Sequence, residues 1–273
     1  MFTREELIRL KKEEKLSVRR LSELSGVPEG TITKIISGET KRPRPATMDA
    51  LWQVFSGGLP YGTGFSRAVL QERAGRWSLC DPAADPQRAD GDGGYTVSDL
   101  ANLTTETRVE LLDGHLFYME AASIVHQLSA EYVSDRIKEY IRKKGGNCLT
   151  ILSPGVYRED DDKNFLIPDL ALVCDRSKIR KKGIAGAPDF VLEVISPSTA
   201  DRDRYLKLGK YMDMGVREYW IIDTEKKLLL AYDFSGAQLT WVQALSGRKE
   251  LAVFDNDLEI DLDGLRQIIE EFA

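Results

Sequence analysis

The chain has 273 residues, of which 42% are hydrophobic and 30% charged, the ordinary balance of a globular protein. It lacks an apolar run of about 18 residues, and its charged N-terminus has no apolar signal core, so we expect a cytoplasmic protein without a membrane partner. Three widely spaced cysteines exclude a disulfide scaffold and a cysteine zinc cluster, and we expect them to be inert. With only two histidines, any metal site should consist mainly of oxygen ligands.

The net charge of −6 is divided unevenly along the chain. Residues 1–60 hold 11 Lys and Arg against 8 Asp and Glu, whereas the remainder carries a net charge of −9. Pro82, Pro86 and the glycine-rich run at 91–94 predict a linker, partly helical, at 57–94. We therefore expect two domains with different partners, a small all-α domain at 1–56 and an α/β domain with a mixed sheet at 95–273.

End signals and apolar spacing predict four short helices in the first domain. The first falls within residues 5–14, and Ser17 caps a second helix that Gly26 ends. The third spans Pro28–Ser37 and stops at Gly38, and Thr47 caps the fourth. The second and third have the order of a helix-turn-helix, in which the later helix enters the DNA major groove by its N-terminus.

The segment 3–56 closely resembles the Cro/C1-type (XRE) family of DNA-binding domains. The matching residues are Leu21, Gly26, Val27, Thr31, Ile32, Ile35, Gly38 and the run at 41–43. Double-stranded DNA is then the expected partner, with contacts from the third helix and from basic residues beyond it. The expected DNA-binding residues are Glu29, Thr31, Thr33, Lys34, Lys41 and Arg42. Glu29 and Gly30 depart from the family pattern, so no base preference carries over, and a module that docks on protein is the alternative.

The second domain alternates between predicted strands and helices. A hairpin over 108–119 turns at Asp113–Gly114, and an amphipathic helix follows at Ile124–Arg142. Short strands are expected at 148–152, 165–174, 189–195, 218–223 and 228–234, with a helix at about Asp201–Met214. Two or three short strands and a last helix should complete residues 238–273.

Three carboxylates and a lysine in this domain point to one site. Glu110 lies in the hairpin, Asp169 follows Pro168 at the start of a strand, and Glu193 stands in an apolar strand. Carboxylates that converge from adjacent strands suit a hard divalent cation such as Mg²⁺ or Mn²⁺. The ammonium of Lys207, on the next helix, can then stabilise charge during attack on a phosphodiester.

The same region is very similar to the Uma2 (DUF820) family of restriction-endonuclease-like proteins, which belongs to the PD-(D/E)XK nuclease superfamily. The similarity spans about 96–235 and rests on ELLDGHL, SIVHQ, IPDLALVCD and GAPDFVLEVISPSTADRDRYLKLGKYMDMGVREYWIID. It implies a restriction-endonuclease-like fold in which Asp169 and Glu193 are the metal carboxylates. Glu110 is then an additional acidic member, or alternatively an exposed hairpin residue.

One departure from the superfamily pattern concerns the lysine. The pattern requires lysine at position 195, where Ile195 stands. Asp203, Lys207 and Tyr211 share a face of the predicted helix, so Lys207 can reach back over the Glu193 strand, whereas Lys210 points elsewhere. His126 remains open between a hydrogen-bonded core residue and a member of the site.

Three functional hypotheses follow, of which the first two belong to different classes. The first is a Mg²⁺-dependent DNA endonuclease, targeted by its own helix-turn-helix, with Asp169, Glu193, Lys207 and Glu110 as catalytic residues. The second is a transcriptional regulator whose nuclease-like domain is inactive and serves dimerisation or ligand sensing. A third and weaker hypothesis is a partner-binding helical domain on an RNA-directed nuclease. A homodimer is expected, because a single recognition helix buries little surface.

Overall fold

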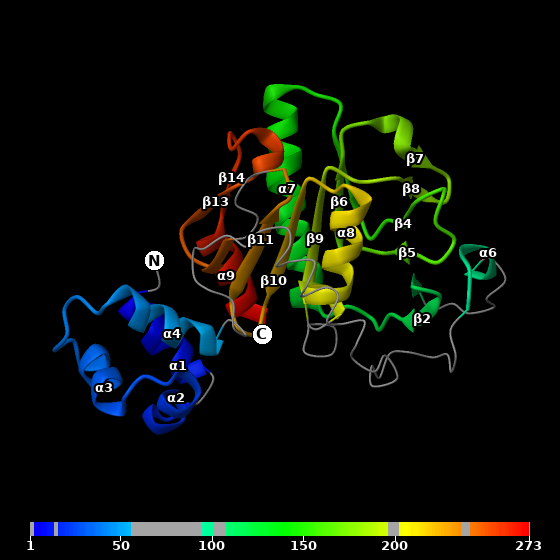
Figure 1. Ribbon diagram of the computed structural model, residues 1–273. Helices are drawn as coiled ribbons and strands as arrows, with labels where there is room; N and C mark the ends of the chain where they lie inside the picture. The colour runs from blue at the N-terminus through cyan, green and yellow to red at the C-terminus, as the bar shows by residue number, and fades with distance from the viewer. Residues whose placement is uncertain are drawn as a thin grey trace.

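The computed structural model describes residues 3–13, 16–55, 94–100, 108–195, 202–235 and 241–272 (Figure 1). The predicted linker at 57–94 therefore lies outside the described residues, apart from Gly94. Cys80 and the residues 196–201 are likewise outside them. None of the helices in the described ranges combines the length and apolar character that a membrane span needs.

Four helices form in the N-terminal part of the chain, as the helix-capping and helix-ending residues predict. They are α1 (Arg4–Glu13), α2 (Val18–Ser25), α3 (Glu29–Ser37) and α4 (Pro45–Phe55). The Ser17 side chain accepts a hydrogen bond from the Arg20 N–H, and Gly26 ends α2 in the left-handed conformation at φ 70°. The predicted cap at Thr47 is wrong, because α4 already begins at Pro45, whose fixed φ suits a first helical position.

These helices pack their apolar sides against one another. The side chains that are almost completely buried between them are Leu7, Leu10, Leu21, Ile32, Ile35, Leu51, Trp52 and Phe55. The guanidinium of Arg4 donates to the carbonyl oxygens of Ile35 and Ile36, and so satisfies acceptors at the C-terminal end of α3. Glu29, Thr33 and Lys34 are left exposed on the outer side of α3.

The larger of the two main sheets, which has the longer strands, has six strands in the order β12-β11-β10-β9-β6-β3. They are β3 (Leu149–Leu152), β6 (Leu170–Val173), β9 (Phe190–Ile195), β10 (Glu218–Asp223), β11 (Leu228–Asp233) and β12 (Trp241–Ala244). Only the β9–β10 pair is parallel, so the sheet is mixed. Every residue of β9 and β10 is buried, because helices cover both faces.

The two faces of this sheet carry different helices (Figure 1). On one face, α7 (Ile124–Lys144) and α9 (Leu262–Phe272) pack against apolar residues such as Leu170 and Leu192. On the other face, α8 (Leu208–Met214) packs against Val191 and Ile221. The expected helix at 201–214 is in fact two elements, because the π-helix η3 (Arg202–Lys207) precedes α8.

A second six-stranded sheet has the order β2-β1-β5-β4-β8-β7. Its strands are β1 (Val109–Leu112), β2 (His115–Tyr118), β4 (Val156–Tyr157), β5 (Phe165–Leu166), β7 (Ile179–Arg180) and β8 (Gly183–Ala185). The expected single strand at 165–174 is wrong, because it divides between the sheets as β5 and β6, with Pro168 between them. Proline has no N–H group for a strand ladder, which suits a break at this position.

The remaining elements are short. They are α6 (Val97–Leu100), the 3-10 helices η2 (Arg176–Lys178) and η4 (Ala252–Phe254), and the strand pair β13 (Arg248–Glu250) and β14 (Glu259–Asp261). The predicted hairpin is confirmed: β1 and β2 pair antiparallel, and Asp113 and Gly114 turn with φ of 50° and 79°. Positive φ at both turn residues is what a tight two-residue hairpin turn requires.

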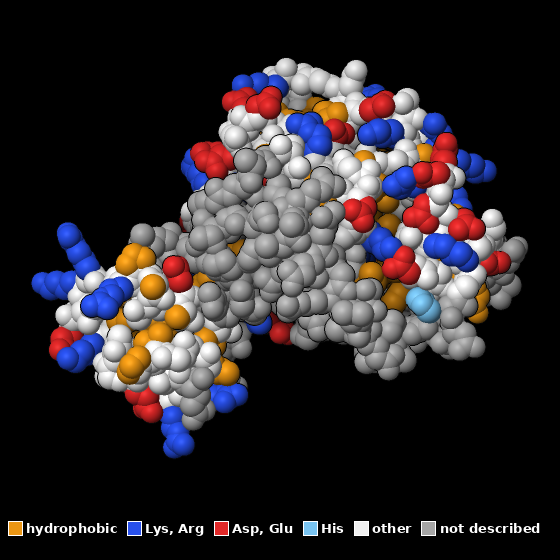
Figure 2. Space-filling model, viewed as in Figure 1, with side chains coloured by type: hydrophobic (Ala, Val, Ile, Leu, Met, Phe, Trp, Pro, Cys, Tyr) orange, Lys and Arg blue, Asp and Glu red, His pale blue; other side chains and the backbone are white. Residues whose placement is uncertain are grey.

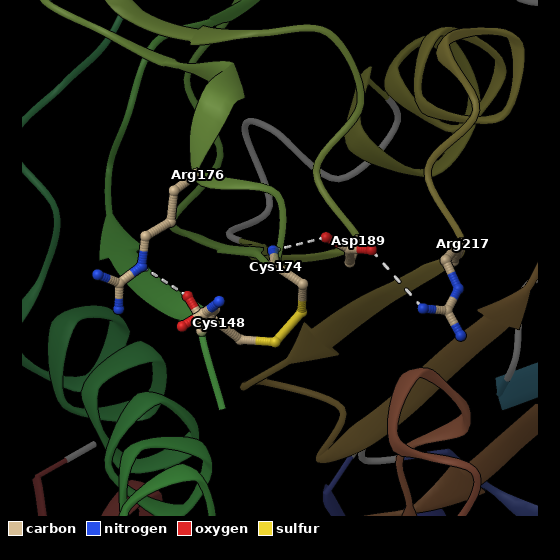
Figure 3. Close-up of a disulfide and its surroundings, with 6 residues drawn as sticks. Cys148, Cys174, Arg176, Asp189 and Arg217 are labelled. Atoms are coloured by element: carbon tan, nitrogen blue, oxygen red, sulfur yellow. Dashed lines mark hydrogen bonds and ion pairs between the residues drawn. A yellow bond between two sulfur atoms is a disulfide. The ribbon is translucent and has the colours of Figure 1, made fainter. Parts of the chain in front are cut away.

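Cys148 and Cys174 form a disulfide (Figure 3). Because β3 and β6 pair Leu149 with Val173, the two cysteines are the next opposed pair along the strands. Asp189 accepts a 2.8 Å hydrogen bond from the Cys174 N–H beside this link. The expectation that the cysteines are inert is wrong for this pair, since strand register joins residues that are 26 positions apart.

Reduction of this disulfide should lower the free energy of unfolding by about 3 kcal/mol, because it releases a constraint on the unfolded chain between residues separated by 26 positions. Urea unfolding with and without dithiothreitol measures the change. Cys148→Ser should reproduce the loss without reductant, and Cys80→Ser, as the matched control, should not. An unfolding midpoint that reductant leaves unchanged would contradict a stabilising role.

Candidate active site

Asp169 and Glu193 are neighbours across two strands of the larger sheet. The antiparallel register of β6 and β9 pairs Leu170 with Leu192, the residues that directly follow Asp169 and directly precede Glu193. Asp169 Oδ2 also accepts a 2.7 Å hydrogen bond from the Val194 N–H. Asp169 is close enough to Glu193 that its charge raises the pKa of the Glu193 carboxyl, so the two predicted metal carboxylates are electrostatic neighbours.

Lys207 extends from the end of η3 into the protein interior. Its Nζ lies 2.9 Å from Glu110 Oε1, 3.0 Å from Glu193 Oε1 and 3.1 Å from Asp203 Oδ1. The lysine side chain is only 2% exposed. One ammonium therefore links three carboxylates that come from β1, β9 and the π-helix, and π-helical turns often occur at functional sites.

Further hydrogen bonds fix the carboxylates that meet Lys207. The Tyr211 hydroxyl, one helical turn after the lysine, donates to Glu193 Oε1 over 2.9 Å. The Ile167 N–H donates to Glu110 Oε1 over 2.8 Å, which holds β1 against the segment that leads to Asp169. Burial raises the pKa of Tyr211 well above its ordinary value, so the hydroxyl keeps its proton and remains a donor.

His126 reaches the other carboxylate of the pair from the first turn of α7. Its Nε2 lies 3.3 Å from Asp169 Oδ2, and its side chain is 21% exposed. The Ser123 side chain accepts a hydrogen bond from the His126 N–H and begins the helix at this position. His126 therefore contacts one of the two predicted metal carboxylates.

The electrostatic balance of this cluster is negative. Glu110, Asp169, Glu193 and Asp203 contribute four carboxyl groups, against one ammonium and one imidazole. Burial raises the pKa of Asp169 to about 6, although His126 and Lys207 oppose the shift. Burial also raises the pKa of Glu193 well above its ordinary value; Lys207 lowers it, and the neighbouring carboxylates raise it further. A further cation would relieve this excess of negative charge.

The donor set fits a hard divalent ion by its chemistry. Within the described ranges, no three His, Cys, Asp or Glu side chains are arranged to hold a metal ion. Mg²⁺, however, commonly uses one or two protein carboxylates and completes its shell with waters and substrate phosphate oxygens. Asp169 and Glu193, as adjacent carboxylates, provide that number of ligands.

The four predicted catalytic residues all meet at this cluster. Glu110, expected as an additional acidic member at the rim of the site or among the metal ligands, or alternatively as an exposed hairpin residue, is completely buried and contacts Lys207. Lys210 forms an ion pair with Asp113 near the surface, so the choice of Lys207 agrees with the geometry.

Two further residues of the cluster carried no predicted role. Asp203 and Tyr211 both contact the groups around Lys207 directly. Their spacing of four residues on either side of the lysine placed all three on one helix face. That spacing was the signal available for both residues. It groups them on one face of the helix, but the sequence does not say which residues that face will contact.

Comparison with known proteins agrees with this architecture. No curated protein matches the chain. A solved structure described as "Crystal structure of a putative nuclease belonging to DUF820 from Anabaena variabilis ATCC 29413" shares the fold, with 19% sequence identity and a TM-score of 0.52. The match covers 64% of this chain and 99% of that chain. The model of the Uma2 family, described as "Putative restriction endonuclease", matches residues 97–263, which is more than half of the chain. The chain therefore belongs to the Uma2 family.

Proposed function

We propose that the chain is a divalent-metal-dependent DNA endonuclease whose ion is held by Asp169 and Glu193. The observation that carries the proposal is the buried ammonium of Lys207, 3.0 Å from the Glu193 carboxylate, whose pKa the nearby Asp169 raises. A lysine beside two adjacent carboxylates is the set of groups that metal-assisted phosphodiester hydrolysis uses. The family description and the DUF820 nuclease of the same fold support this class of reaction.

The chain's own residues have distinct tasks in this reaction. A bound Mg²⁺ or Mn²⁺ supplies Lewis-acid polarisation of the phosphate and of the attacking water. Lys207 places a positive charge where negative charge develops on the phosphate. His126 holds Oδ2 of Asp169, and Tyr211 holds Oε1 of Glu193, so the two carboxylates keep their orientation.

Cleavage of supercoiled plasmid and of linear duplex, with Mg²⁺, with Mn²⁺ and with EDTA, tests this function. The proposal expects nicked or linear products with either ion and none with EDTA. DNA that is bound but uncut under every condition would contradict it. The second hypothesis, a regulator with an inactive nuclease-like domain, would then be favoured. Its supporting observation is that the ammonium of Lys207 occupies the interior of the carboxylate cluster.

Helices α2 and α3 are proposed to bring the protein to DNA as a helix-turn-helix. The turn at Gly26 joins them, and α3 presents Glu29, Thr33 and Lys34 to solvent, with Thr31 half-buried beside them. Lys41 and Arg42 are also exposed. Figure 2 shows basic side chains that project from this part of the molecule. Such groups suit contacts with phosphates, and polar residues early in α3 suit contacts with base edges.

Replacing Lys41 and Arg42 by alanine in the full chain should weaken binding to all duplex sequences. Each lost phosphate contact should reduce the slope of log affinity against log salt by about one. Thr33→Ala or Lys34→Ala should instead change the preference among sequences. Fluorescence anisotropy over a salt series measures both effects, with Lys143→Ala on α7 as the control. An unchanged slope in the double variant would contradict the assignment of Lys41 and Arg42.

A homodimer is proposed for the DNA-bound protein. One recognition helix buries little surface, and two active sites are needed to cut both strands in one encounter. We expect contact through the C-terminal α/β part of the chain. Sedimentation at micromolar concentration, with and without DNA, should show the dimer, and a monomer under both conditions would contradict it.

A further inference from the structure

The ammonium of Lys207 stands in a buried cation position built from carboxylate oxygens. Glu110 Oε1, Glu193 Oε1 and Asp203 Oδ1 all lie within 3.1 Å of Nζ. The three carboxylate side chains are no more than 4% exposed, and they come from β1, β9 and η3. The position is therefore a defined feature of the folded chain, and the ammonium of Lys207 fills it.

Glu193 belongs both to this position and to the pair with Asp169. Its Oε1 accepts hydrogen bonds from Lys207 Nζ at 3.0 Å and from the Tyr211 hydroxyl at 2.9 Å. Asp169 precedes the paired residue Leu170, and its charge raises the pKa of Glu193. An ion held by Asp169 and Glu193 would therefore share one carboxylate with the ammonium, and two cations that close together repel strongly in a buried site.

We propose that Lys207 is a resident counter-cation that competes with the divalent ion for Glu193. The inference rests on the proposed function, because it takes Asp169 and Glu193 as the metal carboxylates. Before the ion binds, the ammonium neutralises part of the cluster; when the ion binds, the ammonium gives up Glu193 and keeps Glu110 and Asp203. Loss of the ammonium therefore strengthens metal binding, although it removes a group that the reaction needs.

Mn²⁺ titrations followed by electron paramagnetic resonance, at pH 8 and constant ionic strength, test the proposal on the full chain. Lys207→Met and Lys207→Gln should each bind Mn²⁺ at least tenfold more tightly than the wild type. Lys207→Arg keeps the charge and should bind with the wild-type affinity. The glutamine amide can donate to the carboxylates, so this variant retains the fold if the methionine variant does not, and circular dichroism checks both.

Lys210→Gln is the matched control. It makes the same change of charge three residues away, on a lysine that pairs with Asp113 rather than with the cluster, and its affinity should not change. An equal gain in Lys210→Gln would overturn the inference, because net charge alone would then explain it. Unchanged or weaker Mn²⁺ binding by the folded Lys207 variants would also overturn the inference, although the proposed metal site would survive that result. No Mn²⁺ binding in any protein would overturn both.

Discussion

Replacing Asp169 by asparagine should abolish DNA cleavage and, without metal, stabilise the fold. Cleavage is lost because the ion loses a carboxylate ligand, and metal-assisted chemistry contributes several kcal/mol, which corresponds to a fall in kcat of at least about a thousandfold. Stability rises because burial raises the pKa of Asp169 from 3.8 to about 6. Ionised Asp169 thus destabilises the folded state at neutral pH, whereas an amide remains neutral.

The stabilisation should depend on pH in a defined direction. Below about pH 3.8, Asp169 is protonated in both the folded and the unfolded states, so its ionisation has no effect on stability. As pH rises through 6, the wild type loses stability that the variant keeps. The gain should reach about 2–3 kcal/mol at pH 8. Urea unfolding at pH 4 and pH 8 measures it, with the surface variant Asp135→Asn as control. A variant less stable than the wild type at pH 8, or one that still cuts DNA, would contradict this prediction.

Replacing Lys207 by methionine should have the opposite effect on stability. The variant leaves Glu110, Glu193 and Asp203 buried without their ammonium, and breaking a buried ion pair from one side costs about 3–5 kcal/mol. The loss should be largest at pH 8 and smaller at pH 5, because the Glu193 carboxyl, whose pKa is raised by burial, then takes up a proton more readily. Urea unfolding at both pH values measures it.

Lys210→Met provides the control for that experiment. Lys210 lies three residues later, on α8, and pairs with Asp113, whose side chain is 56% exposed; surface pairs contribute at most about 1 kcal/mol. The two methionine variants should therefore differ in stability by at least about 2 kcal/mol. Equal losses would show that the buried cluster does not depend on its lysine.

Elements with strong local signals could be predicted from the sequence. The turn at Asp113–Gly114, the cap at Ser17 and the long helix α7 each depend on a few adjacent residues or on a sustained periodicity. The second sheet could not be predicted in the same way. Its strands β4, β5 and β7 have two residues each, which is too short for an alternating pattern, and pairing with distant strands defines them.

The candidate site was only partly predictable for the same reason. Asp169 and Glu193 follow from strand ends and from an acid within an apolar run. The burial of Glu110 depends on the pairing of β1 with β5, and on the hydrogen bond from Ile167, which no local pattern contains. The link between Cys148 and Cys174 likewise arises from the register of β3 and β6.

The position of a bound ion tests the central claim most directly. Crystals of the full chain grown with Mn²⁺ would locate the ion by its anomalous scattering. We expect one peak between the carboxyl groups of Asp169 and Glu193, with the ammonium of Lys207 turned toward Glu110 and Asp203. The same experiment on Glu193→Gln should show no peak at that position. A wild-type peak elsewhere in the molecule, or none at millimolar Mn²⁺, would contradict the assignment of these two carboxylates as the metal site.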